Sequence, residues 1–563
     1  MQTVSAAFTT HAGLGRHRDV CKFEVQWNGT DWVDESVHVL AHEGDVSLAE
    51  TGTGELSPLG TTDKLKVTLK NYQWRFSPLH TGGDDDIRAN ISGAAGMHGI
   101  ACRLGQGFAT TSTAVTAWAD LGGGLVRGTA ASHGLEVGDY LRVQGSGEYN
   151  GRYTVAAKTA TTFDIAATWG TNTARGRVQK IEVVRAFTGV IYGHSEDTWQ
   201  KTVDIEVRDV GFGYLQARAS TLIYENQRVD QWLATLATLA GIASTAFDTG
   251  LHRIGYCWLD DESILEDMRA AAAAAGGRLY FDHSGTLRYE EPTHWLGSPH
   301  TSSVWTLDAG DGAMTPEYDA AELATEIVVE TSPRAPLAWD VIYTLDRAIT
   351  IPPSSTVTFQ ARLQTPATVI DDLVESDFYL STAGGHPMRQ YCTVTLTKYG
   401  QRATVNITNA HTSMAADLTF FQLRGSPLGG APSEQIVEDV AAPAVSTTRT
   451  RSLRDNAYVQ SAGQAGGLAS YLADRYRRMI PVWKVELKPG ASLPHVELGD
   501  RITFSDGRIV SAARDGFVTG IAWRFDVKGY GQTVTLLDAE DLYSGGPYYV
   551  IGATALGSGE AWH

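Results

Sequence analysis

Cysteine is scarce in this sequence, and its placement limits the sites that it can form. The chain of 563 residues has four cysteines, Cys21, Cys102, Cys257 and Cys392, and no two of them form a C-x-x-C pair. A zinc site would need closer spacing. We therefore expect the four cysteines to be buried free thiols.

Long apolar runs and basic segments are also missing. No stretch approaches about 18 consecutive apolar residues, so no membrane span is expected. The opening "MQTVSAAFTTHAGLGRHRD" lacks the charged start and apolar core of a signal peptide. Lys and Arg number 45 against 64 Asp and Glu, a net charge of −19. This excess argues against tight sequence-specific binding of nucleic acid, but it allows a wall along which DNA slides without sticking.

The signatures of common catalytic sites are absent. The chain has no H-E-x-x-H, no G-x-S-x-G, no G-x-x-x-x-G-K-[ST] and no paired C-x-x-C. Glu290 and Glu291 are adjacent, so on a strand they point to opposite faces and cannot flank one glycosidic bond. The acidic run 84–86 lacks the ligand spacing of a calcium loop. Histidines in turn-like settings are expected to be solvent or turn residues: His98, His194, His252 and His283. We assign no catalytic, cofactor-binding or metal-binding residue and expect no cofactor and no enzymatic activity.

Alternating apolar residues are abundant and predict a mainly β protein with a few α-helices. Residues 64–76 and 201–207 alternate apolar and polar side chains, and 59 glycines supply turns. Helical spacing is found over 229–240 and 466–479. The apolar faces predicted for these two helices are Val229, Trp232, Leu233, Leu236 and Leu239, then Leu468, Leu472, Tyr476 and Met479.

Residues 269–292, "RAAAAAAGGRLYFDHSGTLRYEEP", raise the question of a phosphate-binding loop. Such a loop needs its glycines after a strand and before a helix. Here Ser263 to Glu266 forms a capping box that begins a helix, so Gly276 or Gly277 falls where a left-handed C-cap belongs. Two short strands joined by a turn at 282–285 then predict a hairpin. The segment is therefore predicted to be a helix–hairpin unit.

An internal repeat joins distant parts of the chain. Residues 187–209 align without a gap to 518–540, and Thr188-Gly189 matches Thr519-Gly520. Two unrelated hairpins of similar composition could give the same match, whereas the sharper interpretation is a duplicated β-barrel domain. Residues 133–165 and 334–430 are strand-rich and predict modules inserted into loops.

Two segments resemble the tail-hub, or baseplate hub, proteins of tailed bacteriophages. They are the helix–glycine–hairpin segment and the run 454–506, which contains the turn Leu498-Gly499-Asp500. Residues 133–165 resemble β-modules of phage structural proteins. The family shares its architecture with the hubs of contractile injection machines, including type VI secretion spikes. The resemblance extends over roughly 1–100, 180–300 and 440–545.

The resemblance implies two tube-like β-barrel domains per chain, which in a trimer form a ring of six similar barrels. The predicted divisions are 1–105 with 182–225 (first barrel), 106–181 (inserted small β domain), 226–300 (α+β helix–hairpin domain), 301–333 with 440–545 (second barrel), 334–439 (inserted Ig-like β-sandwich) and 546–563 (C-terminal tail).

The implied function is that of a structural virion protein. A homotrimeric hub would adapt the sixfold tail tube to a threefold tip and line the DNA-ejection channel. Its expected partners are a tail-tube or distal-tail protein on one side and a tip or fibre protein on the other. Its expected location is the virion tail tip, after synthesis in the host cytoplasm. Two alternatives are binding of host surface glycan through the β insertions and, less favoured, hydrolysis of the cell wall.

Overall fold

The computed structural model shows a mainly β protein, as predicted. It describes residues 2, 4–5, 8–9, 12, 19–48, 63–77, 99–110, 112–170, 175–214, 216–318, 323–438, 450–476, 480–488, 490–509, 512–526 and 529–539. In that part of the chain three α-helices occur: α3 (Val229–Ala240), α4 (Ile264–Ala274) and α5 (Ala462–Tyr476). The acidic run 84–86, His98, Met479, most of the stretch 439–450 and the C-terminal tail lie outside the described residues.

The first β unit is a six-stranded antiparallel sheet with a short hairpin strand at its edge. Its spatial order is β1 (Asp19–Val25), β5 (Ala101–Ala109), β12 (Arg177–Asp197), β13 (Thr202–Asp209), β4 (Lys64–Lys70) and β3 (Val39–Ser47), with β2 (Val33–Asp34) on the outer side of β1. Leu65, Val67 and Leu69 of β4 point inward and are buried, as their alternation predicted.

The second β unit repeats this arrangement. Its order is β21 (Trp305–Asp308), β36 (Arg501–Ser505), β37 (Arg514–Asp526), β38 (Gly529–Asp538), β35 (Val482–Leu487) and β22 (Gly312–Glu317). The six strands follow one another along the chain in the same sequence as those of the first unit. One pairing differs, because β1–β5 is antiparallel and β21–β36 is parallel. Among the described residues neither sheet closes into a barrel.

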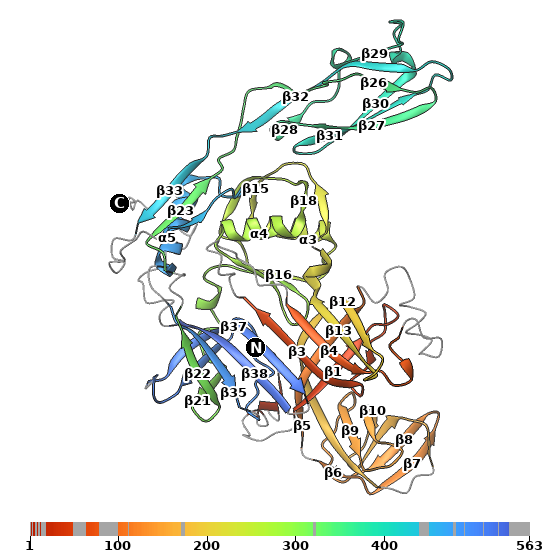
Figure 1. Cartoon of the computed structure of the whole chain (residues 1–563), viewed down its shortest axis with the longest axis vertical. Coiled ribbons are helices and arrows are strands. Elements are labelled where there is room, and N and C mark those ends of the chain that lie inside the picture. Colours follow the sequence, from red (N-terminus) through yellow and green to blue (C-terminus); the bar gives the residue numbers. More distant parts are fainter. Residues whose placement is uncertain are drawn as a thin grey trace.

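The two units are joined edge to edge by β3 and β37, a contact that we call the seam. His42 to Ser47 pair antiparallel with Gly520 to Phe525, so one sheet runs through both units. Buried side chains of both units also form one continuous core. The approach is close, since a Cβ on Gly44 would lie 2.7 Å from Trp523 Cζ2 and 2.9 Å from the Lys64 carbonyl oxygen. The seam therefore joins the two units directly (Figure 1).

A neutral histidine is buried in the seam. The His42 ring stacks on Phe525 with 5.2 Å between centroids, and among the described residues neither ring nitrogen has a hydrogen-bond partner. Burial lowers the pKa of His42 from 6.5 to about 3. Above about pH 6.5 the ring is neutral in both the folded and the unfolded state, so the free energy of unfolding has its full value. As the pH falls from 6.5 towards 3, the unfolded chain binds a proton that the buried ring does not, and the free energy of unfolding decreases by about 1.4 kcal/mol per pH unit.

We expect His42→Leu to remove this acid sensitivity. Between pH 7.5 and 5 the wild type should lose about 2 kcal/mol of unfolding free energy more than the variant, because only the wild type must charge a buried ring. Urea unfolding at both values measures the difference. His386→Leu, at an exposed histidine, should follow the wild type. Equal pH dependence of His42→Leu and wild type would contradict the prediction.

The repeated hairpin is present in both units, but the ungapped alignment of its residues is wrong. Gly189 pairs with Asp209, whereas Gly520 pairs with Thr535 rather than with residue 540. The alignment also equates Tyr192, which is 40% exposed, with Trp523, which is 4% exposed. The turns differ in length, and the bulges lie at different places in β12 and β37. The repeat is thus one of topology.

The helix–hairpin unit forms as predicted. The Ser263 hydroxyl accepts a hydrogen bond from the Glu266 amide at the start of α4. At its end Gly276 has φ +66°, and the amides of Gly276 and Gly277 donate to Ala273 and Ala272. This is a Schellman motif, so the glycine pair ends a helix. β19 (Arg278–Phe281) and β20 (Leu287–Glu290) follow as an antiparallel hairpin.

Helices α3, α4 and α5 pack with this hairpin around a second core. α5 begins at Ala462, four residues before the predicted start, and Leu239 of α3 is exposed although it was predicted on the apolar face. Short strand pairs complete the unit: β14 (Arg218–Ser220) with β18 (Asp260–Ser263), β15 (Tyr224–Arg228) with β17 (Arg253–Cys257), and β16 (Thr245–Phe247) beside β20.

A small β module interrupts the first unit between β5 and β12. Its strands are β6 (Thr113–Ala114), β7 (Ala117–Gly122), β8 (Leu125–Thr129), β9 (Tyr140–Gln144), β10 (Gly151–Lys158) and β11 (Thr162–Ala166). They pair in the order β7-β8-β11-β10-β9 and join the start of β12. The module has its own core, which includes Tyr149 and Phe163.

A second module, the distal module, extends away from the β units beyond α3 and α4 (Figure 1). In one sheet β32 (Ala416–Gly429) is flanked by β24 (Ala335–Pro336), β25 (Asp340–Thr344), β26 (Ile349–Ile351), β28 (Ala367–Ile370) and β29 (Phe378–Ser381). In the other, β31 (Arg402–Asn409) lies between β27 (Ser355–Arg362) and β30 (Cys392–Lys398). A core separates the two sheets. The stem of the distal module is a three-stranded sheet, in which β23 (Glu326–Thr331) lies between β33 (Ser433–Glu438) and β34 (Thr450–Leu453).

All four cysteines are free, as predicted. Cys21, Cys102 and Cys257 are buried, whereas Cys392 is only half-buried because it starts β30 beside the turn at the edge of the distal module.

Candidate functional site

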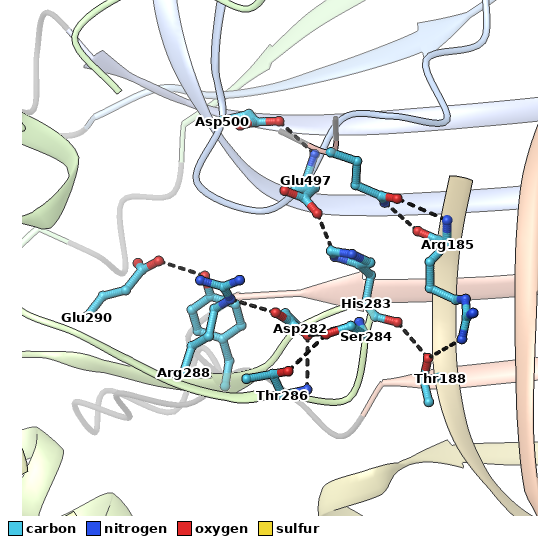
Figure 2. A network of polar contacts seen from close by, with 12 residues as sticks. Arg185, Thr188, Asp282, His283, Ser284, Thr286, Arg288, Glu290, Glu497 and Asp500 are labelled. Carbon is cyan, nitrogen blue, oxygen red and sulfur yellow. Dashed lines mark hydrogen bonds and ion pairs between the residues drawn. The ribbon is translucent and has the colours of Figure 1, made fainter. Parts of the chain in front are cut away.

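The turn of the β19–β20 hairpin, residues 282–286, lies where the helix–hairpin unit meets both β units; we call it the junction turn. The Thr188 hydroxyl of β12 donates to the His283 carbonyl oxygen at 2.8 Å. On the other side His283 Nδ1 lies 2.6 Å from Glu497 Oε1, which comes from the second β unit. His283 therefore contacts both halves of the repeat (Figure 2).

Local chemistry fixes the shape of the junction turn. Asp282 Oδ1 accepts hydrogen bonds from the amides of Ser284 and Thr286 at 2.9 and 3.0 Å and from the Ser284 hydroxyl at 2.6 Å. Gly285 has φ +81°, and a Cβ there would lie 2.9 Å from Val210 Cγ2. An aspartate-led turn with a glycine in the left-handed region is thus required both by its backbone and by its neighbours.

Charges of opposite sign are matched around the turn. Arg288 Nε lies 2.6 Å from Asp282 Oδ2. Burial raises the pKa of Asp282, but its hydrogen bonds and Arg288 outweigh this and lower it. Burial likewise raises the pKa of Glu497, whereas the hydrogen bond and charge of His283 help to lower it to about 2. Glu497 is therefore ionised at neutral pH and forms a charged contact across the junction.

The turn Leu498-Gly499-Asp500 lies on the opposite side of the same junction. Gly499 has φ +82°, and its amide donates to Val518 at 2.7 Å, while Asp500 accepts from the Val518 amide at 2.8 Å. A Cβ on Gly499 would lie 2.8 Å from Trp295 Nε1. That indole nitrogen donates a hydrogen bond to Glu290. The two motifs behind the family resemblance are therefore brought together in space.

A cavity of about 320 Å³ lies within the junction. Its lining carries both signs of charge, including Arg185, Arg288, Glu290 and Glu497. In the described residues no group of three His, Cys, Asp or Glu side chains is placed to hold a metal ion. The arrangement matches charges between segments far apart in the chain, which is the chemistry of a structural joint.

The glutamates and histidines singled out in the sequence have structural partners. Glu290 accepts from Tyr280 and Trp295, while Glu291 accepts from Tyr289 and the Leu251 amide, so the two do not share a site. His194 is exposed, as predicted.

The prediction of a solvent or turn role was wrong for His252 and incomplete for His283. His252 is buried, and its backbone carbonyl caps the start of α3. His283 does lie in a turn, but it also pairs with Glu497. No sequence signal marks that pair, because its members are separated by more than a third of the chain.

None of the helices in the described part of the chain is long and apolar enough to cross a membrane.

No protein-family model matches this sequence, and no curated protein is significantly similar to it. Among solved structures, a tail protein from Neisseria meningitidis MC58 is 9% identical, with 93% of this chain and 98% of that chain covered, at a TM-score of 0.43. The 43 kDa tail protein of prophage MuSo2 from Shewanella oneidensis is 11% identical, with 93% and 99% covered, at a TM-score of 0.44. A type VI secretion component from E. coli is 8% identical, with 91% and 77% covered, at 0.32. Identities this low do not transfer function.

Proposed function

We propose that the chain is a structural virion protein, the homotrimeric hub of a phage tail. The observation that supports this most directly is the repetition of one six-stranded order, in the same chain order, in two units joined at the seam. A protein with two such units can present sixfold pseudo-symmetry from three copies. In this proposal the two units are the tube-like barrel domains. Their sheets would close only in the assembled ring, through pairing between protomers.

The strand edges indicate how copies would join. β3 and β37 make the seam, and their counterparts by topology are β22 and β12. Among the described residues β22 pairs only with β35, and the end of β12 beyond Ile191 pairs only with β13. Placing β22 of one protomer beside the β12 end of the next would repeat the seam around a ring. Pro316 on β22 lacks an N–H, so one bond of that ladder would remain unmade.

The junction gives the ring a fixed geometry. Because the junction turn contacts β12 and Glu497 together, it holds the two units at one angle. Tail-tube or distal-tail proteins would dock on one face and a tip or fibre protein on the other, with DNA passing through without specific binding. The titratable groups of the junction each have a structural partner, and we infer that the protein is not an enzyme. The boundaries predicted from the sequence remain our proposed domain division, except that β14, β15 and α5 are assigned to the helix–hairpin unit with which they pair or pack. The virion tail tip is our proposed location.

Molar mass in solution tests the trimer. Light scattering of the full chain should give three times the 60.7 kDa of one copy, and negative-stain micrographs should show rings. A stable monomer without rings would refute the proposal. Zymography on peptidoglycan should show no clearing, and a cleared zone would favour the hydrolase alternative.

A single charge should weaken the trimer without unfolding the chain. Thr315 of β22 is exposed and lies opposite Lys484, so Thr315→Glu is compatible with the protomer. In the ring it would lie near Glu196 and Asp197 at the acidic end of β12, where like charges repel. We expect at least a tenfold weaker association by light scattering over a dilution series. Thr395→Glu on the distal module is the control, and equal weakening by both variants would contradict the placement.

Of the two alternatives, the structure offers a specific observation for glycan binding alone. In the first module the rings of Trp118 and Trp169 both pack against the buried ring of Tyr149. These two tryptophans therefore contribute to the packing of that module. Four other exposed aromatic side chains lie on the distal module: Trp339, Tyr379, Tyr391 and Phe420.

A further inference from the structure

The two outward faces of the distal module differ sharply. On the sheet β27–β31–β30 the outward side chains are polar and pair with one another: Thr356 with Thr408 at 2.8 Å and Thr358 with Asn406 at 2.7 Å. The outward face of the β32 sheet instead carries large exposed rings. Trp339 is 54% exposed, Tyr379 49% and Phe420 39%. We call this second surface the aromatic face.

Strand geometry places these rings in line. Beyond its bulge β32 points Phe420, Gln422 and Arg424 outward in alternation, while Phe421 and Leu423 are buried in the core. Tyr379 of β29 lies opposite Phe420, and Val341 of β25 lies opposite Arg424. From Phe420 to Arg424 the strand advances about 14 Å at about 3.4 Å per residue.

Polar groups hold the far end of the aromatic face in place. Trp339 Nε1 donates to Asp371 Oδ2 at 2.6 Å. The Arg424 guanidinium lies 5.5 Å from the Trp339 ring centroid and is paired with Asp377. The indole and the guanidinium are thus oriented before any ligand arrives, which lowers the entropic cost of binding.

The distal module is itself anchored at its base. Asp260 of the helix–hairpin unit, whose side chain is buried, pairs with Arg402 at 2.6 Å and Arg362 at 3.1 Å. The Gly400 amide donates to Thr221 at 2.7 Å. The module therefore projects as a fixed arm, with its far end away from the β units (Figure 1).

We propose that the aromatic face binds a polysaccharide. Pyranose rings present an apolar C–H face that packs flat against aromatic rings. Their hydroxyls need donors and acceptors, which Thr344 and the atoms of Gln422 and Arg424 that are not bound to Asp377 supply between those rings. The length of the face, at about 3.4 Å of strand per residue, matches the length of about two to three linked sugars. A protein partner would favour a continuous apolar centre, which the interspersed polar side chains interrupt.

Binding is tested with the full chain on an array of purified, protein-free bacterial surface polysaccharides; only this choice of probe rests on the proposed function. The wild type should bind at least one polysaccharide, and prior periodate oxidation of the sugars should abolish binding. The double variant Tyr379→Ala/Phe420→Ala should bind at least tenfold more weakly, and so should Trp339→Ala. Thr358→Ala/Thr395→Ala on the opposite sheet is the matched control and should bind as the wild type does.

Three results would overturn the inference. They are no binding to any polysaccharide, equal binding by the wild type and the aromatic variants, and binding only to protease-sensitive material that resists periodate. Thermal unfolding of each variant checks folding, and because all three rings are exposed little change is expected. Light scattering on the same samples keeps the two proposals separate, since a monomer that still binds polysaccharide would refute the hub and leave this inference standing.

Discussion

Replacing Gly276 and Gly277 together with valine is expected to destabilise the chain strongly and to lower its yield of soluble protein. Gly276 has φ +66°, a conformation that costs an L-residue about 1–2 kcal/mol. At Gly277 a Cβ would lie 2.6 Å from Tyr289 Cε2 and 2.8 Å from the Glu290 carbonyl oxygen, so β20 would have to move. Overpacking of this kind adds about 1–3 kcal/mol. Together these costs come to about 2–5 kcal/mol, a large part of the stability of a domain, which is about 5–15 kcal/mol.

Soluble yield and the thermal midpoint measure this effect. Gly466→Ala in α5 is the matched control, because that glycine has helical backbone and a Cβ there meets nothing within 4 Å. Alanine at this position should leave the protein as stable as before or up to about 1 kcal/mol more stable. A valine pair that folded normally but lost binding of a nucleotide would show that the glycines form a ligand loop after all.

The end of α4 and the hairpin that follows it show what the sequence could predict. The end of α4 depends on residues within about six positions of one another: a serine cap, an alanine run and a glycine whose left-handed backbone closes the helix. The hairpin that follows depends on alternation and an aspartate-led turn. Such features depend only on residues close together in the sequence, so the helix–hairpin unit could be predicted almost to the residue.

The repeat could be predicted only as a topology. Thr188-Gly189 and Thr519-Gly520 do fall on corresponding strands, β12 and β37. The residue alignment failed because a change in turn length or a shifted bulge moves side chains to the other face of a strand without leaving a mark in composition. The seam was beyond prediction for another reason, since it pairs β3 with β37 from opposite ends of the chain.

The junction could not be found from sequence because its parts are individually ordinary. Asp282, His283 and Gly285 are typical turn residues, and Glu497 precedes another turn. Only the fold shows that one turn lies against the other, with the His283–Glu497 contact between them. Buried Glu290 is a similar case, since its partners Tyr280 and Trp295 are set by the hairpin and the segment after it.

Breaking the junction should release the helix–hairpin unit from the β units without unfolding either. In Glu497→Ala, His283 loses the charged contact at 2.6 Å, which we expect to cost about 1–3 kcal/mol because both side chains are largely shielded from water. Hydrogen exchange should rise in the junction turn and at Val518, whose amide bonds to the 498–500 turn, while the amides of α3 and α4 stay protected. Lys398→Ala, which removes an exposed ion pair with Asp372, should leave stability close to that of the wild type.

Assembly gives this prediction its functional weight. If the junction turn sets the angle between the two β units, Glu497→Ala chains should form rings more weakly than the wild type, and Lys398→Ala chains should form them normally. Gly285→Val provides an independent route to the same end, because its side chain would displace Val210 and Thr188 from the turn. Light scattering and micrographs of the three variants decide the matter. Normal rings from both junction variants would show that the seam alone fixes the angle, since the β3–β37 ladder and the shared core would then suffice to hold the units in place.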